Sequence, residues 1–169
     1  QYEIPTESVL RTLEIAEEES TPVIFNFAPV SDFPAERIRS VHTLVVNETE
    51  AAALSGHSVE NERDAGEAAK KLRDMGAAVV ILTLGAAGSI VATSDGTRRI
   101  DAFPVAAVDT TAAGDTYCGC LVTALSEGKT LDEAVRFASA GAALSVQKLG
   151  AQPSAPRRAE IDDFLASRG

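Results

Sequence analysis

The segment AVVILTL at 78–84 restricts the fold of this chain more than any other feature. A nearly unbroken apolar run of this length is typical of a central strand that is buried on both faces, as happens when helices cover a parallel sheet. Strand-like and helix-like stretches alternate along the rest of the sequence. The alternation predicts one α/β domain with a largely parallel sheet.

Individual segments can be assigned from local signals. Ser94-Asp95-Gly96 is a turn signal that predicts a hairpin, and Thr130 with Glu133 forms a capping box that opens a helix. Short apolar runs predict strands at 23–27, 42–46, 78–84, 89–93 and 97–101. Apolar residues at helical spacing predict helices at 6–18, 47–55, 64–75, 113–127, from the capping box to about 146, and at 157–167.

Charge and cysteine content exclude several classes of partner. The formal net charge of −10 argues against nucleic acid and anionic membrane surfaces, and no apolar run approaches the roughly 20 residues of a membrane helix. Cys118 and Cys120 lie two residues apart in a helical pattern and face different directions, so we expect two separate thiols in a reducing cytoplasm. The chain begins with Gln1 and not Met, so we expect an N-terminal portion to precede it.

Three polar or glycine-rich stretches lie at the ends of strand-like segments: NETE at 47–50, TLGAAG at 83–88 and, after the apolar segment FPVAAV at 103–108, DTTAAGD at 109–115. Ligands of open α/β sheets bind beyond the carboxyl ends of the strands, so these stretches are the candidate site. Asn47 is suited to a phosphate contact and Glu50 to a magnesium ion held through water. A solvated first helical turn, where acids are favoured, explains both residues equally well. A simple turn likewise explains the glycines of TLGAAG.

The stretch around Asp115 carries the sharpest hypothesis. Ala112, Ala113 and Gly114 leave their N–H groups unshielded, and a helix that starts here would add its positive end. Such a site can take the charge that develops on a transferring phosphoryl group, while Asp115 accepts a proton from an attacking hydroxyl. The alternative is an acid that only stabilises a helix N-terminus.

The motifs DTTAAGDT, NETEA and TLGAAG and the tail KLGAQPSAP, in their order along the chain, resemble the ribokinase (PfkB) family of carbohydrate kinases. The resemblance covers the whole chain but only the C-terminal half, or slightly more, of a family member. It implies a three-layer α/β/α ribokinase-like sandwich in which residues 1–169 form the C-terminal nucleotide-binding portion. The N-terminal strands and the β-lid are absent, so this portion alone is expected to be inactive, and the full-length protein is expected to be a homodimer.

The resemblance also implies roles for single residues. Asp115 would be the catalytic base, with Ala112, Ala113 and Gly114 as the anion hole, and Glu3 would lie near the sugar. Glu50 would hold Mg²⁺ through water. ATP contacts would come from Asn47, Thr83, Leu84, Gly85, Ala86, Ala87, Gly88, Gly114, Asp115 and, near the adenine, Ser139. A K⁺ activator would be held, in several cases by backbone carbonyls, at Asp109, Thr111, Ser145, Lys148, Gly150 and Ser154.

The implied activity is ATP-dependent phosphorylation of the primary hydroxyl of a sugar, D-ribose to D-ribose 5-phosphate in the first instance. A kinase for another sugar or nucleoside, and a nucleotide-binding module without catalysis, remain alternatives. The segment Asn26-Phe27-Ala28-Pro29 departs from the Asn-Pro-Ala-Pro that is common in the family. We expect a change of packing there and no loss of chemistry.

Overall fold

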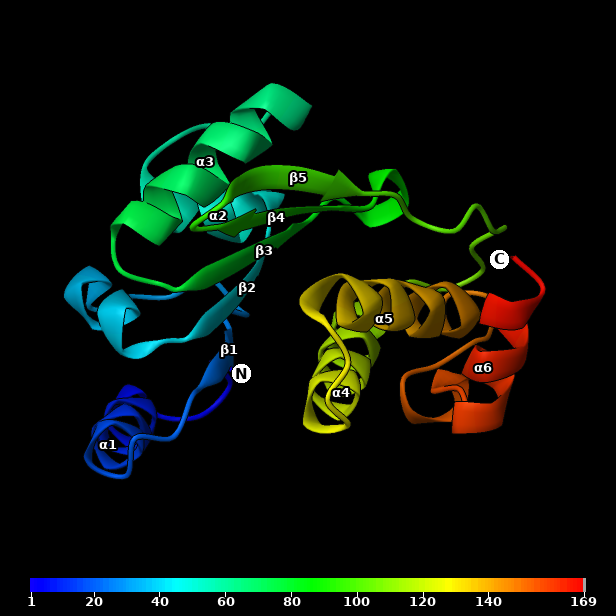
Figure 1. Cartoon of the computed structure of the whole chain (residues 1–169), viewed down its shortest axis with the longest axis horizontal. Helices are drawn as coiled ribbons and strands as arrows, with labels where there is room; N and C mark the ends of the chain where they lie inside the picture. Colours follow the sequence, from blue (N-terminus) through cyan, green and yellow to red (C-terminus); the bar gives the residue numbers. More distant parts are fainter. Residues whose placement is uncertain (169) are drawn as a thin grey trace. The chain divides into compact units, whose positions relative to one another are not determined.

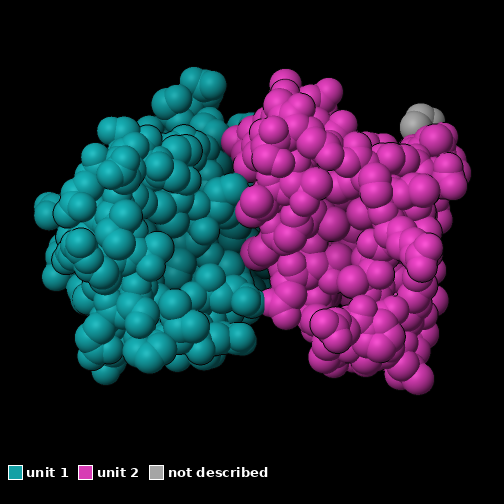
Figure 2. Space-filling model, turned by 90° about the horizontal axis from the view of Figure 1, so that it is seen from below, with its two compact units in different colours: residues 1–84, 89–99 teal, residues 85–88, 100–169 magenta. Residues whose placement is uncertain are grey.

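The computed structural model describes residues 1–168, which form two compact units (Figure 2). The sheet unit comprises Gln1–Leu84 and Ser89–Arg99. The helical unit comprises Gly85–Gly88 and the chain from Ile100 onward. No helix within the described residues is both long enough and apolar enough to cross a membrane.

The sheet has five strands in the order of the sequence (Figure 1). The first three are parallel, whereas β4 runs antiparallel to β3. The predicted sheet is therefore only partly parallel, because the short connection at 84–88 reverses the chain between β3 and β4. The turn at Ser94 and Asp95 then leads from β4 into β5, where the hairpin was expected. The five strands are β1 Ile24–Asn26, β2 Thr43–Asn47, β3 Val79–Thr83, β4 Ser89–Thr93 and β5 Gly96–Ile100.

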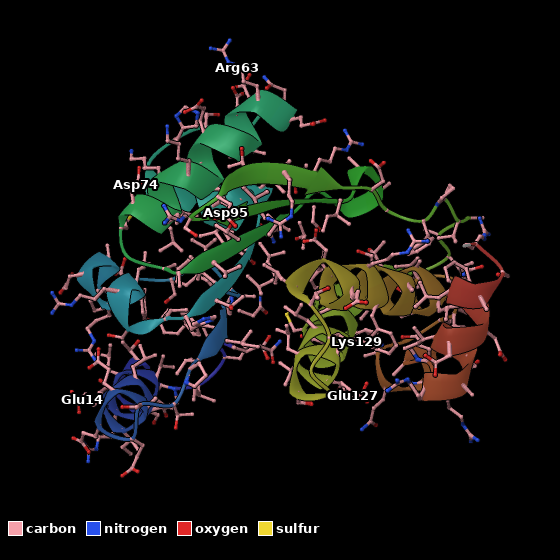
Figure 3. The ribbon with its side chains drawn as sticks, viewed as in Figure 1. Glu14, Arg63, Asp74, Asp95, Glu127 and Lys129 are labelled. Carbon is pink, nitrogen blue, oxygen red and sulfur yellow. The ribbon has the colours of Figure 1, made fainter. Side chains whose placement is uncertain are left out.

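Helices α2 (Glu48–Ser55) and α3 (Glu62–Asp74) pack on the sheet (Figure 1). The face that α3 turns inward is fully buried and almost entirely alanine, which lets its backbone approach the strands closely; it consists of Ala65, Ala68, Ala69 and Leu72. Arg63, on the same helix, points outward (Figure 3). The helix begins two residues before the predicted start because the Asn61 side chain caps it, accepting a hydrogen bond from the Asp64 N–H at 3.0 Å.

An aromatic cluster, defined here as Tyr2, Phe25, Phe27 and Phe33, fills the core of the sheet unit beside β1. Phe27 is completely buried, and its ring stacks on Tyr2 at a centroid distance of 5.5 Å. A proline at position 27 could not supply these ring contacts, and the change of packing relative to the family stays a prediction. Helix α1 (Thr6–Glu18) and the 3₁₀ turn η1 (Ala35–Ser40) complete the unit.

The helical unit is built on the packing of α4 (Ala113–Ser126) against α5 (Leu131–Ser145). The helices meet closely at Gly141, where an added Cβ would lie 2.5 Å from the Cys120 sulfur. Cys118 and Cys120 both lie on α4 and are not joined by a disulfide. The capping box at Thr130 and Glu133 is confirmed. The remaining elements are η2 (Gly85–Ala87), η3 (Gln152–Ser154) and α6 (Arg158–Ala166).

Candidate active site

In the sheet unit, the candidate residues gather where the three parallel strands end. Asn47 closes β2 and pairs in register with Thr83 at the end of β3, and the Thr83 hydroxyl donates to the Val46 carbonyl at 3.3 Å. The Tyr2 N–H donates to the Ala28 carbonyl, two residues after β1, at 2.9 Å. Glu3, which follows Tyr2 and is exposed, therefore lies at the same edge of the sheet.

Asn47 and Glu50 bind each other in a reciprocal capping box at the start of α2. The Asn47 side chain accepts from the Glu50 N–H at 2.9 Å, and the two Glu50 oxygens accept from the Asn47 N–H and Nδ2 at 2.8 and 2.9 Å. Glu50 is only 6% exposed, and burial raises the pKa of its carboxyl group against the lowering effect of the Asn47 hydrogen bonds. The alternative of a merely solvated first turn is wrong for Glu50, because that acid is buried.

The 83–88 loop is shaped mainly by the protein's own backbone. Gly88 has φ +100°, and a Cβ there would lie 2.2 Å from the Ile100 oxygen and 2.8 Å from the Ala102 nitrogen. Gly85 also has positive φ, +54°, but nothing lies within 4 Å of where its Cβ would be. Packing is sufficient to explain Gly88, so the exposed stretch Gly85–Ala87 is the part of the loop with room for a ligand.

Asp115 lies in the first turn of α4 and is exposed, as the proposed proton acceptor must be. Ala112 precedes the helix in the left-handed conformation, at φ 57° and ψ 17°. The Ala113 N–H donates to the Thr110 carbonyl at 3.2 Å and is thus occupied in the turn. Among the described residues no acceptor is found for the Gly114 N–H. The predicted anion hole therefore loses Ala113 as a ready donor and retains Gly114.

The Asp109 side chain links the turn before α4 to the loop after α5 by hydrogen bonds. Its carboxylate accepts from the Thr111 N–H at 2.9 Å and from the Gly150 N–H at 2.8 Å. The hydrogen bond of Asp109 with the Thr111 side chain, and after it the bonds from the Gly150 and Thr111 N–H groups, lower the pKa of Asp109 to about 2. The N–H groups of Val108 and Asp109 both donate to the Val146 carbonyl, at 2.7 and 3.1 Å. The structure thus brings together the two loops that were predicted to hold K⁺.

Three other side chains of the predicted K⁺ set form hydrogen bonds or an ion pair with nearby residues. The hydroxyl of Ser145 donates to the Ala142 carbonyl and that of Ser154 to the Ala151 carbonyl, while the Lys148 ammonium pairs with Glu160. The Ser145 and Ser154 oxygens still have lone pairs for a cation, whereas Lys148 can offer only its backbone carbonyl. Ser139, predicted near the adenine, is 7% exposed in the middle of α5.

The described residues contain no cluster of three or more His, Cys, Asp or Glu side chains that could hold a metal ion by themselves. A magnesium ion needs fewer protein ligands, because it keeps several waters and binds substrate phosphates. The Glu50 carboxylate still has lone pairs beyond its two bonds to Asn47 and fits a contact through water.

The comparison with protein families decides the classification. The model described as "pfkB family carbohydrate kinase" matches residues 1–158. The chain belongs to the PfkB family of carbohydrate kinases. Its fold is the ribokinase-like α/β fold, as the solved structures of other members show.

Relatives within this family are similar along nearly the whole chain. Ribokinase of Haemophilus influenzae is 44% identical over 165 residues, which cover 98% of this chain and 54% of the relative. Ribokinase from Thermotoga maritima, known from a crystal structure, is 40% identical in sequence, and its structure matches with a TM-score of 0.88. The match covers 98% of this chain and 55% of that protein. Arabidopsis thaliana ribokinase, solved with ribose and ATP, is 33% identical with a TM-score of 0.92, over 98% of this chain and 54% of that one. This chain spans about half the length of these family members.

The sequence predictions assigned no role to Tyr2, although its bonds place Glu3 at the sheet edge. The available signal was an aromatic residue directly before a predicted substrate-binding acid, with phenylalanines at 25, 27 and 33 to pack against it.

Proposed function

We propose that the full-length polypeptide containing this chain transfers the γ-phosphate of ATP to the primary hydroxyl of a sugar, converting D-ribose to D-ribose 5-phosphate. The observation that carries the proposal is the start of α4, where the Gly114 N–H has no acceptor among the described residues and Asp115, the next residue, is exposed. A donor for phosphate oxygens and an acceptor for a hydroxyl proton are thus adjacent on one helical turn. The similarity to the Arabidopsis ribokinase solved with ribose and ATP supports the choice of substrates.

In this mechanism Asp115 removes the proton from the sugar hydroxyl as its oxygen attacks the γ-phosphorus, and ADP leaves on the opposite side. The phosphoryl group is transferred without a covalent enzyme intermediate. The Gly114 N–H and the positive end of α4 stabilise the negative charge that spreads over the transferring group. Catalysis on this helix therefore consists of one proton transfer and electrostatic stabilisation.

The Asn47–Glu50 pair is assigned to the magnesium and phosphate end of ATP. Asn47 would contact a phosphate, and Glu50 would bind Mg²⁺ through water, which fits a buried carboxylate with limited access. Mg²⁺ supplies charge neutralisation on the phosphates when it is bound. The exposed stretch Gly85–Ala87 would line the nucleotide.

K⁺ is assigned to the carbonyl groups of the two loops that Asp109 joins, since a large monovalent cation suits oxygen ligands from the backbone. Its place beside the turn that leads to Ala112 would let it order the anion hole without contact with ATP. We also infer a cytoplasmic location and a homodimer for the full-length protein, from the resemblance to the family.

Sugar-dependent release of ADP by the full-length protein tests the proposal. Ribose, 2-deoxyribose, fructose and a nucleoside are offered at equal concentrations with MgATP, with and without KCl. We expect the highest kcat/KM for ribose and a higher rate with K⁺ than with an equal concentration of a bulky organic cation. ATP binding with no turnover on any acceptor would contradict the kinase proposal and favour a nucleotide-binding module.

A further inference from the structure

Tyr2 is fixed in place by its ring. It is 5% exposed although it is the second residue of the chain. Its ring stacks on Phe27 at 5.5 Å and meets Phe25 and Phe33 edge to face at 6.0 and 5.5 Å. Contacts with three rings hold the aromatic plane in one orientation.

The polar atoms of Tyr2 fix the residue a second time. The hydroxyl donates to the Asp32 carbonyl at 2.7 Å and also forms a hydrogen bond of 2.8 Å with the Thr6 hydroxyl. The Tyr2 N–H donates to the Ala28 carbonyl at 2.9 Å. Tyr2 therefore joins the N-terminal segment, the 28–32 loop and the start of α1.

Glu3 lies between this anchor and the first turn of α1. On its other side the Pro5 carbonyl accepts from the Ser8 and Val9 N–H groups, at 2.9 and 3.2 Å. The backbone that carries Glu3 is thus held on both sides, at Tyr2 and at Pro5, while Glu3 itself is exposed. Among the described residues no side chain or backbone group bonds the Glu3 carboxylate, so the position of this carboxylate depends on the two anchors.

We propose that Tyr2 is a positioning residue for sugar binding, and that its hydroxyl places the Glu3 carboxylate to accept hydrogen bonds from sugar hydroxyls. The inference rests on the proposed sugar kinase function. A carboxylate is recognised best by hydroxyls whose spacing matches its two oxygens, so a small shift of the segment weakens binding of the sugar. Binding of ATP, whose assigned contacts lie on other segments, should not change.

Steady-state kinetics of the full-length protein with ribose and MgATP test the assignment. Tyr2→Phe keeps the ring and removes only the hydroxyl. We expect the KM for ribose to rise roughly 3- to 10-fold, the usual effect of losing a buried hydrogen bond. The kcat and the KM for ATP should stay within about twofold of the wild type. Phe103→Leu, which loses a ring contact with Phe164 outside the aromatic cluster, should lower the melting temperature and leave the KM for ribose unchanged.

A double-mutant cycle separates positioning from general stability. Glu3→Gln should raise the KM for ribose, and Tyr2→Phe in that background should add little, because the hydroxyl acts through Glu3. Independent, multiplicative effects would overturn the proposal, as would an unchanged KM for ribose in Tyr2→Phe. If the wild-type protein phosphorylates no sugar at all, the proposed function fails and this inference fails with it; an active wild type with an unaffected Tyr2→Phe refutes only the inference.

Discussion

The two units hold their candidate residues in different ways. In the sheet unit Asn47 and Glu50 are three residues apart and satisfy each other, within one capping box at the end of a strand. In the helical unit Asp109 is held by Gly150, 41 residues away, and Gly88 is packed against Ile100 and Ala102. Because its contacts are local, the arrangement in the sheet unit can be predicted from the sequence and depends little on distant residues. Long-range contacts make the helical unit sensitive to the loss or gain of single atoms.

The largest expected effect on stability tests this sensitivity at Gly88. Gly88→Ala places a Cβ 2.2 Å from the Ile100 oxygen at a φ of +100°, so the backbone must shift. We expect the free energy of unfolding to fall by about 3 kcal/mol, from overpacking together with backbone strain. Gly85→Ala is the matched control, because it has positive φ and open space; it should cost about 1 kcal/mol. Equal losses in urea unfolding of the two variants would contradict the close packing at Gly88.

The next largest effect is the stability that the hydrogen bonds of buried Glu50 contribute to the sheet unit. Asn47→Ala removes a helix cap and also the side-chain partner of buried Glu50, so we expect a loss of about 2 kcal/mol. Asn61→Ala is the control: it removes a cap of the same kind from α3, where the partner Asp64 is accessible, and should cost about 1 kcal/mol. If the two variants lose the same stability, the carboxylate contributes nothing beyond capping.

The two acids should respond to pH with opposite signs. The pKa of Asp109 is lowered from 3.8 to about 2, so its contribution is present above pH 3.8 and is lost as pH falls toward 2. The pKa of Glu50 is raised above 4.5, so its contribution is largest below pH 4.5 and is lost as pH rises through the raised value. Melting temperatures of the wild type, Asp109→Asn and Glu50→Gln from pH 2 to 7 check both. Differences from the wild type that do not vary with pH would refute the assignment.

The smallest effect concerns Ala112, which adopts φ 57° without being glycine. Ala112→Gly relieves the left-handed strain but adds freedom to the unfolded chain, so we expect a gain of about 0.5 kcal/mol. Ala113→Gly, at the first helical residue, should instead lose about 0.5 kcal/mol. Thermal unfolding of both variants decides the matter, and a loss in Ala112→Gly would show that the methyl group is needed for packing.

Much of the fold was accessible from the sequence because its signals are local. The apolar run at 78–84 predicted β3, and the Thr130–Glu133 box predicted the start of α5. The predicted start of α3 lies two residues too late, because the Asn61 side chain caps the helix ahead of its apolar pattern. The hydrogen bonds of Asp109 with Gly150 and of Tyr2 with Asp32 join residues 41 and 30 positions apart, and no spacing rule reveals such pairs. The occupation of the Ala113 N–H depends on the shape of one turn, which the residue types alone do not determine.

The central claim is that Asp115 accepts the proton of the sugar hydroxyl at the start of α4. It is tested most directly by the kcat of Asp115→Asn in the full-length protein, with Asp132→Asn, an exposed acid in the first turn of α5, as control. We predict a fall in kcat of roughly 10²- to 10⁴-fold for Asp115→Asn, with the KM for ATP little changed and Asp132→Asn close to the wild type. Near-wild-type turnover by Asp115→Asn, or an equal loss in both variants, would contradict the account.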